Sequence, residues 1–165
     1  MSRLSYNSSA RKVNPDTMAR TKLPAPTPVT PDEVEHELYA AMQGGDLERL
    51  MAVWSDDDEI TCVHPGGARL VGAAAIRAAF EAMFAQGSIA VEPHKVRRLE
   101  SHSTSVHSVV ERIRVMTAAG EQFAWVVATN VYLKSAQGWR LVAHHASPGS
   151  ATEIHDIAET ASTLH

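Results

Sequence analysis

The chain has 165 residues, 44% of them hydrophobic, and a formal net charge of −4 at pH 7. This size predicts one globular domain with a core of its own, and no apolar run reaches the roughly 18 residues that a membrane span needs. The acidic balance disfavours nucleic acid as a partner. We therefore expect a cytoplasmic protein with no membrane segment and no nucleic-acid partner.

Residues 1–28 have the composition of a disordered basic leader and linker. Five basic residues stand here against one acidic residue, and they are scattered. No apolar stretch follows them, so the segment is not typical of a secretory signal. The proline-spaced "LPAPTPVTP" at 23–31 predicts an extended linker rather than a helix or a central strand.

A helix is predicted from residue 31 onward. Thr30 is a suitable N-cap, Pro31 fills the first helical position, and Glu33 completes a capping box. Apolar residues then recur at helical spacing. The glycine pair at 44–45 predicts the end of this helix.

Two further helices and a short strand are predicted before residue 88. Asp46 is a suitable cap for a short helix over 47–54. Alternation over 60–64 predicts a strand, which contains the lone Cys62, interpreted as a small buried hydrophobe. A third amphipathic helix is expected over 73–87.

From residue 88 onward the pattern is that of β-strands. Pro93 lies in the first of them and indicates an edge strand or a bulge. Three longer strands follow, joined only by "AAG" and "SAQG", and connections this short form antiparallel hairpins. We expect an α+β cone over 29–149, with N-terminal helices on the concave face of a strongly curved, antiparallel and partly mixed sheet. Residues 150–165 are expected to form a C-terminal helix or tail.

The order of elements and several motifs resemble the nuclear transport factor 2-like superfamily. Within it, the chain is similar to SnoaL-like proteins and to the association domain of calcium/calmodulin-dependent protein kinase II. The resemblance rests on "GDLERLMAVWSDDDEITCVHPGG", "RLVGAAAIRAAF" and "TNVYLKSAQGWRLVAHHASP", and covers roughly residues 31–148. It implies the cystatin-like α+β cone, a ligand pocket inside it, and a homodimer formed through the convex face of the sheet.

The resemblance constrains function less than fold, because the superfamily includes isomerases, dehydratases, cyclases and protein-binding modules. Its cyclases pair an acid/base carboxylate with a histidine inside the cone. In the kinase association domain, the position matching Asn130 holds a pocket arginine, so this sequence departs from the carboxylate-clamping pattern.

The register of the two long hairpins predicts which residues share a face. A turn at 136–137 would place Ala128 opposite His145, and a turn at 119–120 would place Glu111 opposite Ala128. This face carries the polar residues Glu111, Asn130 and His145, which are unusual on a surface that packs into a core. We therefore assign it to the cavity. Of the adjacent pair in "LVAHHASP", His145 is then expected to point inward and His144 outward; a slip of one residue would reverse them.

Glu111 and His145 are the candidate catalytic residues. A histidine has a suitable pKa for proton transfer, and a carboxyl group in an apolar cone has the raised pKa that a general acid requires. The predicted function is a cofactor-independent proton-transfer enzyme, of isomerase, dehydratase or cyclase type, acting on a small apolar molecule. The alternative is a non-catalytic ligand-binding or protein-association module in which these side chains are hydrogen-bonded core residues.

Further residues are expected to line the cavity around that pair. Asn130 would hold a carbonyl or hydroxyl group of the ligand, and for His64 a turn-capping role remains equally open. The complete set of expected ligand-binding residues is Asn130, His64, Trp54, Tyr132, Val109 and Ser147.

The opposite face of the sheet is also apolar and is expected to form the dimer interface. Its candidate residues are Phe123, Trp125, Val127 and His144. No metal site is expected, since adjacent histidines diverge on a strand and the acidic run 56–59 lacks the spacing and the glycine of a calcium loop. No phosphate loop or dinucleotide fingerprint is found, so no cofactor is expected.

Overall fold

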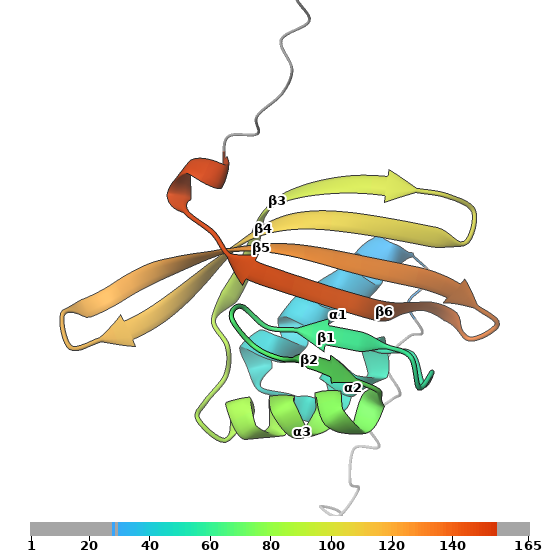
Figure 1. Ribbon diagram of the computed structural model, residues 1–165, viewed down its shortest axis with the longest axis horizontal. Helices are drawn as coiled ribbons and strands as arrows, with labels where there is room; N and C mark the ends of the chain where they lie inside the picture. The colour runs from blue at the N-terminus through green and yellow to red at the C-terminus, as the bar shows by residue number, and fades with distance from the viewer. Residues whose placement is uncertain (1–27, 29, 155–165) are drawn as a thin grey trace, which may run out of the picture.

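The computed structural model describes Pro28 and residues 30–154. The basic leader up to residue 27 and the tail beyond residue 154 lie outside the described residues. Three helices precede most of a six-stranded sheet (Figure 1). The elements are α1 (Pro31–Gly44), α2 (Leu47–Val53), β1 (Thr61–Val63), β2 (Arg69–Val71), α3 (Ala73–Phe84), β3 (Val91–Glu100), β4 (Thr104–Thr117), β5 (Gly120–Ser135), β6 (Gly138–Pro148) and the 3-10 helix η1 (Ala151–Ile154).

The first helix begins and ends where its capping residues predict. The Thr30 side chain accepts a hydrogen bond from the backbone N–H of Glu33 at 3.2 Å, and Pro31 needs no such partner. Gly45 ends the helix with a φ of 62°, a left-handed conformation that glycine adopts without steric cost. The buried stripe of α1 includes two polar residues, Glu35 and Tyr39.

The other two helices follow their predictions with small differences in length. Asp46 caps α2 by accepting the N–H of Arg49 at 3.0 Å. Helix α3 buries Ile76 and Phe80 and ends at Phe84, one turn earlier than expected. No described helix is long and apolar enough to cross a membrane.

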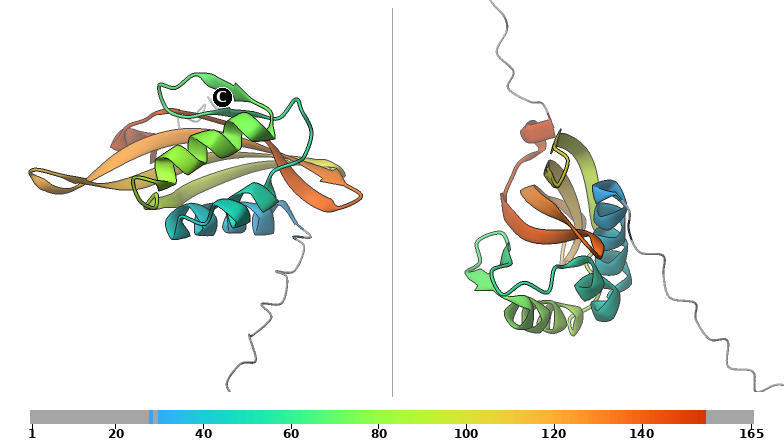
Figure 2. Two further views of the ribbon diagram at one scale, coloured as in Figure 1. Left: turned by 90° about the horizontal axis from the view of Figure 1, so that it is seen from below. Right: turned by 90° about the vertical axis from the view of Figure 1, so that its right-hand side faces the viewer.

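The sheet is mostly antiparallel and has the strand order β2-β1-β6-β5-β4-β3. Among the described strands only β1 and β6 pair in parallel, so the sheet is mixed, as expected. The helices lie along one face, and the β4–β5 hairpin extends past them (Figures 1 and 2). Strand β3 forms one edge, and its register shifts between Pro93 and Lys95, which confirms both consequences drawn from the proline.

The main core lies between the helices and the inner face of the sheet. Its sheet side is built from alternate residues, as the period of two requires. The buried residues of this inner face include Val109, Val126, Ala128, Tyr132, Trp139 and Leu141. The polar residues Glu111, His107 and Asn130 are buried among them, so the predicted assignment of this face to the interior is confirmed for β4 and β5.

The β4–β5 turn differs from its expected position without changing either face. Thr117 pairs with Gly120, which places the turn at 118–119, and Glu111 lies opposite Val126 instead of Ala128. The register differs from the expected one by two residues. An even shift leaves each side chain on the same face.

The β5–β6 pairing contains an irregularity that reverses the predicted orientation of the two histidines. The turn at 136–137 is correct, since Ser135 pairs with Gly138. Between Leu141 and Ala143 the strand carries one extra residue, so His144, not Ala143, lies opposite Asn130. His144 therefore points inward and His145 is exposed; the prediction for this pair is wrong because a β-bulge changes the alternation.

Candidate functional site

A pocket of about 150 Å³ opens between the helices and the inner face of the sheet. Its volume is that of a cavity which accommodates a single six-membered ring. The wall is mostly apolar and comes from α1, α3, β3, β4 and β6, with further residues that follow α2, β1 and α3 in the chain. The residues lining it are Leu38, Met42, Trp54, His64, Pro65, Phe80, Met83, Ile89, Val91, Glu111, Ile113, His144 and Ala146.

Glu111 supplies a carboxyl group to this apolar wall. Only 4% of the residue is exposed, and the hydroxyl of Tyr39 donates a hydrogen bond to its Oε1 at 2.7 Å. Burial raises the pKa of Glu111 to about 7, although the Tyr39 hydrogen bond favours the ionised form. At neutral pH the carboxyl group is therefore available both as a proton donor and as a proton acceptor.

His144 supplies a ring nitrogen to the same pocket, two strands away from Glu111. Its Nδ1 lies 2.7 Å from the Oδ1 of Asn130. Burial is the main cause that lowers the pKa of His144 to about 4, and His64 and His145 lower it further. The ring is therefore neutral at pH 7.

The contacts of Asn130 decide which nitrogen of His144 carries the proton. The amide nitrogen of Asn130 lies 3.5 Å from Oε2 of Glu35. The hydroxyl of Tyr132 donates a hydrogen bond to the same oxygen at 3.1 Å. Since a carboxylate only accepts, the amide nitrogen faces Glu35 and the amide oxygen faces His144. An amide oxygen also only accepts, so Nδ1 of His144 holds the proton and Nε2 keeps its lone pair.

His64 also lines the pocket, between the rings of Phe80 and His144. Its ring packs edge-on against Phe80 with centroids 5.1 Å apart, and it lies 6.3 Å from the ring of His144. Burial lowers the pKa of His64. Burial also raises the pKa of the neighbouring Cys62 thiol to about 12, so this cysteine is poorly suited to act as a nucleophile.

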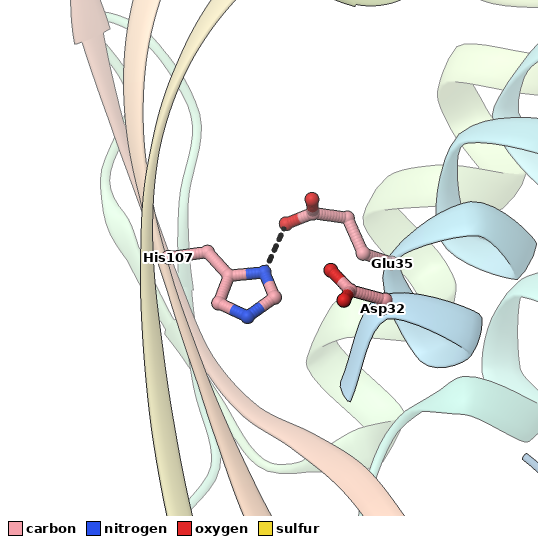
Figure 3. Close-up of side chains that lie close together, drawn as sticks. All are labelled: Asp32, Glu35 and His107. Carbon is pink, nitrogen blue, oxygen red and sulfur yellow. Dashed lines mark hydrogen bonds and ion pairs between the residues drawn. The ribbon is translucent and has the colours of Figure 1, made fainter. Parts of the chain in front are cut away.

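A second polar cluster lies beneath α1, where Asp32 and Glu35 face His107 of β4 (Figure 3). Their ligand atoms lie within 4.8 Å of one another, a spacing that could hold a metal ion. However, Asp32 is paired with Arg98 at 2.7 Å, and Oε2 of Glu35 lies 2.8 Å from Nδ1 of His107. Because both carboxylates already have hydrogen-bond partners within the protein, we interpret the cluster as a packing network.

The structure brings only some of the expected site residues to the pocket. Glu111, His64 and Trp54 line it, whereas Asn130, Tyr132 and Val109 are fully buried beside it. The remaining three differ from expectation: His145 and Ser147 lie on the exposed side of β6, and His144 lines the pocket instead of the outer face.

The reason for these differences is again the bulge in β6. It places Ser147 opposite Val127, an outward residue, and the Ser147 hydroxyl lies 3.4 Å from the Val127 carbonyl. The expected ligand contact of Ser147 and the expected interface position of His144 are therefore corrected together with the orientation of His145.

Sequence reasoning missed Glu35 and Tyr39, which hold the polar groups of the site from α1. A signal for them existed: they are four residues apart and adjoin the apolar positions Val34 and Leu38. A carboxylate within the buried stripe of an amphipathic helix needs hydrogen-bond donors in the core. Those partners come from β4 and β5, more than 70 residues away in the chain.

Comparison with solved structures supports the same fold. A protein of Thiobacillus denitrificans, provisionally described as a calcium/calmodulin-dependent protein kinase type II association domain, is 36% identical, with 76% of this chain and 99% of that one covered and a TM-score of 0.68. A provisional dehydratase of the NTF2-like family from Streptomyces avermitilis is 27% identical over 73% of this chain and 94% of that one, with a TM-score of 0.65.

A more distant likeness extends to the CaMKII hub of S. rosetta, with 23% identity, 74% of this chain and 99% of that one covered, and a TM-score of 0.59. No curated protein matches the sequence. The family model described as a SnoaL-like domain matches residues 32–151. This match spans α1 to the start of η1, so the chain belongs to the SnoaL-like family.

Proposed function

We propose that the protein is a cofactor-independent proton-transfer enzyme, of isomerase or dehydratase type, that acts on a small, mostly apolar molecule. The observation that carries this proposal is the pair Glu111 and His144 on the wall of one apolar pocket. Burial raises the pKa of Glu111 toward neutral pH, as a general acid requires, and keeps His144 in the neutral form that can accept a proton. His144 thereby takes the role that the sequence assigned to His145.

The two groups have complementary roles in this proposal. Neutral His144 accepts a proton from the substrate at Nε2 and becomes an imidazolium, while protonated Glu111 donates a proton to another atom of the substrate. If that atom is carbon, the product is an isomer; if it is a hydroxyl oxygen, water leaves. Exchange with solvent then returns a proton to Glu111 and removes one from His144.

The provisional dehydratase from Streptomyces avermitilis is consistent with this reaction class. The association-domain-like protein from Thiobacillus denitrificans favours a second candidate, a non-catalytic module that binds a ligand or assembles with other chains. The two candidates differ in whether the pocket moves protons of its ligand.

The test is deuterium incorporation into a ligand recovered from the pocket. Native mass spectrometry of the purified protein would identify a co-purifying molecule, which is then incubated with the protein in D₂O. We expect the wild-type protein to introduce deuterium, and the rate to be highest between about pH 4 and about 7, where His144 is neutral and Glu111 protonated. Glu111→Gln and His144→Gln should each lower the rate at least about 100-fold while binding persists.

His145→Gln is the matched control, because this neighbouring histidine is exposed on the other side of the same strand. It should keep the wild-type rate. Binding without incorporation in the wild-type protein would refute the enzyme and favour the binding module.

We also propose that two copies associate through the outer face of β5. Phe123 is 49% exposed there, and Trp125 and Val127 are partly exposed on the same face. An apolar face of this kind is typical of an interface between subunits. Structures similar to association domains support the same expectation of an oligomer.

A further inference from the structure

The hydrogen bonds behind the pocket restrict which ligands it can take. His144 meets the pocket with a ring nitrogen, and the contacts of Asn130 leave the lone pair on that nitrogen, as derived above. A neutral nitrogen with a lone pair accepts a hydrogen bond and cannot donate one. A ligand that contacts it must therefore present an O–H or N–H group.

The charges around the pocket impose a second restriction. The described residues that line it include no lysine or arginine, and Glu111 provides the one carboxyl group. Both lining histidines have lowered pKa values and are neutral at pH 7. A carboxylate ligand would find no compensating cation, so the cost of its desolvation would not be offset, and the ionised fraction of Glu111 would repel it.

The volume gives a third restriction. A cavity of about 150 Å³ with apolar walls suits one six-membered ring or a branched chain of similar size. Phe80 and Trp54 add aromatic surface to this wall.

We propose that the Glu35–Asn130 relay fixes His144 as a hydrogen-bond acceptor and that the pocket thereby selects small, uncharged, hydroxyl-bearing molecules over ketones and carboxylates of the same shape. Glu35 and Asn130 are positioning residues in this scheme, since each acts through its neighbour. The inference rests on the proposed function in taking the same pocket as the ligand site. Its test needs no turnover, so the two can fail separately.

The first measurement concerns the ring of His144 in the wild-type protein. Nitrogen-15 NMR of the histidine side chains distinguishes the two neutral forms of the ring, and His144→Gln identifies the signal. We expect the proton on Nδ1 at pH 7. A ring protonated on Nε2 would overturn the proposal, whatever the ligands do.

The second measurement compares three ligands that share one ring: cyclohexanol, cyclohexanone and cyclohexanecarboxylate. Binding is followed at pH 7 by chemical shifts of the pocket residues. Cyclohexanol should bind about tenfold more tightly than cyclohexanone, because the ketone leaves the acceptor nitrogen unpaired, and the carboxylate should bind more weakly than either. Equal affinity for alcohol and ketone, tighter binding of the carboxylate, or no binding of the alcohol at millimolar concentration would each overturn the proposal.

The third measurement tests the relay itself. Asn130→Leu keeps nearly the same side-chain size but removes the acceptor that holds the Nδ1 proton. The NMR spectrum should show both neutral forms of His144, and the preference for alcohol over ketone should fall to about twofold or less. His145→Gln, on the exposed side of β6, should keep the wild-type preference. An unchanged preference in a folded Asn130→Leu protein would contradict the relay, and if that variant does not fold, the wild-type spectrum and ligand series still decide.

Discussion

Burial acts in opposite directions on the pKa values of Glu111 and His144, two titratable groups of the pocket. For Glu111 it disfavours the charged form and raises the pKa to about 7, and for His144 it disfavours the charged form and lowers the pKa to about 4. In both side chains burial thus favours the uncharged form. The hydrogen bonds from Tyr39 to Glu111 and between Asn130 and His144 orient these two side chains, but they do not offset the full cost of burying a charged form.

These shifts predict opposite pH dependences of stability. Glu111 has a pKa of about 7 in the folded chain against 4.5 as its ordinary value, so the folded state holds the proton more tightly. Its contribution to the free energy of unfolding is greatest below pH 4.5 and falls as the pH rises to 7. The free energy of unfolding of Glu111→Gln, measured by urea denaturation, should therefore rise by about 3 kcal/mol relative to that of the wild type as the pH increases from 4.5 to 7.

His144→Gln is the matched comparison for that experiment. The wild-type contribution of His144 is fully present above pH 6.5 and decreases as the pH falls toward 4, so the difference between wild type and this variant should have the opposite slope. A difference curve for Glu111→Gln that stays flat with pH would contradict the burial of an uncompensated carboxyl group.

Two elements determine the site: helix α1 and strand β6. Helix α1 holds Glu35 and Tyr39 against the inner face of the sheet, and its start is fixed by a local capping interaction at Thr30. Strand β6 brings His144 to the pocket through its bulge. The bulge lies where the end of α2 meets the same strand, since the N–H of Ser55 donates to the carbonyl of Leu141 at 2.9 Å.

The helix cap gives a prediction at the scale of the element. Thr30→Ala should lower the free energy of unfolding by about 1 kcal/mol, because the N–H of Glu33 loses its acceptor. Thr30→Ser keeps the hydroxyl and should stay within about 0.5 kcal/mol of wild type. Urea denaturation of the three proteins measures both values, and equal stability of the alanine and threonine proteins would exclude the capping contribution.

At the scale of the whole molecule, the described helices α1, α2 and α3 cover one face of the sheet (Figure 2), and the other face exposes apolar residues such as Phe123. On the other face, the guanidinium of Arg112 lies over the ring of Phe123 at 4.8 Å, and His94 packs edge-on against Trp125 at 5.3 Å. These contacts cover part of the aromatic surface and leave the rest open.

Association through this face gives a prediction for the complete chain. Trp125→Glu would place a charge in the centre of the proposed interface and should convert the wild-type oligomer to a monomer in light scattering coupled to size-exclusion chromatography. Gln137→Glu adds the same charge at an exposed turn away from this face and should leave the oligomer intact. A wild-type protein that is monomeric at all concentrations tested would refute the proposed interface.

The helix starts at Thr30 and Asp46, the hairpin turn at 136–137 and the inward face of β4 were all predictable from the sequence. Each depends on local interactions or on a strict period of two, which a single chain segment displays by itself. The pocket residue Glu111 was predictable for the same reason. The placement of the helices on one face of a curved sheet followed from the order of these elements in the chain, and the family resemblance implied the same fold.

Only the tertiary structure decided between His144 and His145, and only it revealed Glu35 and Tyr39 as partners of the site. One extra residue in β6 reverses the alternation beyond it, and no residue type in "LVAHHASP" marks where that occurs. The bulge depends on how β6 meets β5, β1 and the end of α2 at once. Contacts between segments distant in the chain therefore fixed which histidine faces the pocket, and a periodic pattern within one strand does not contain that information.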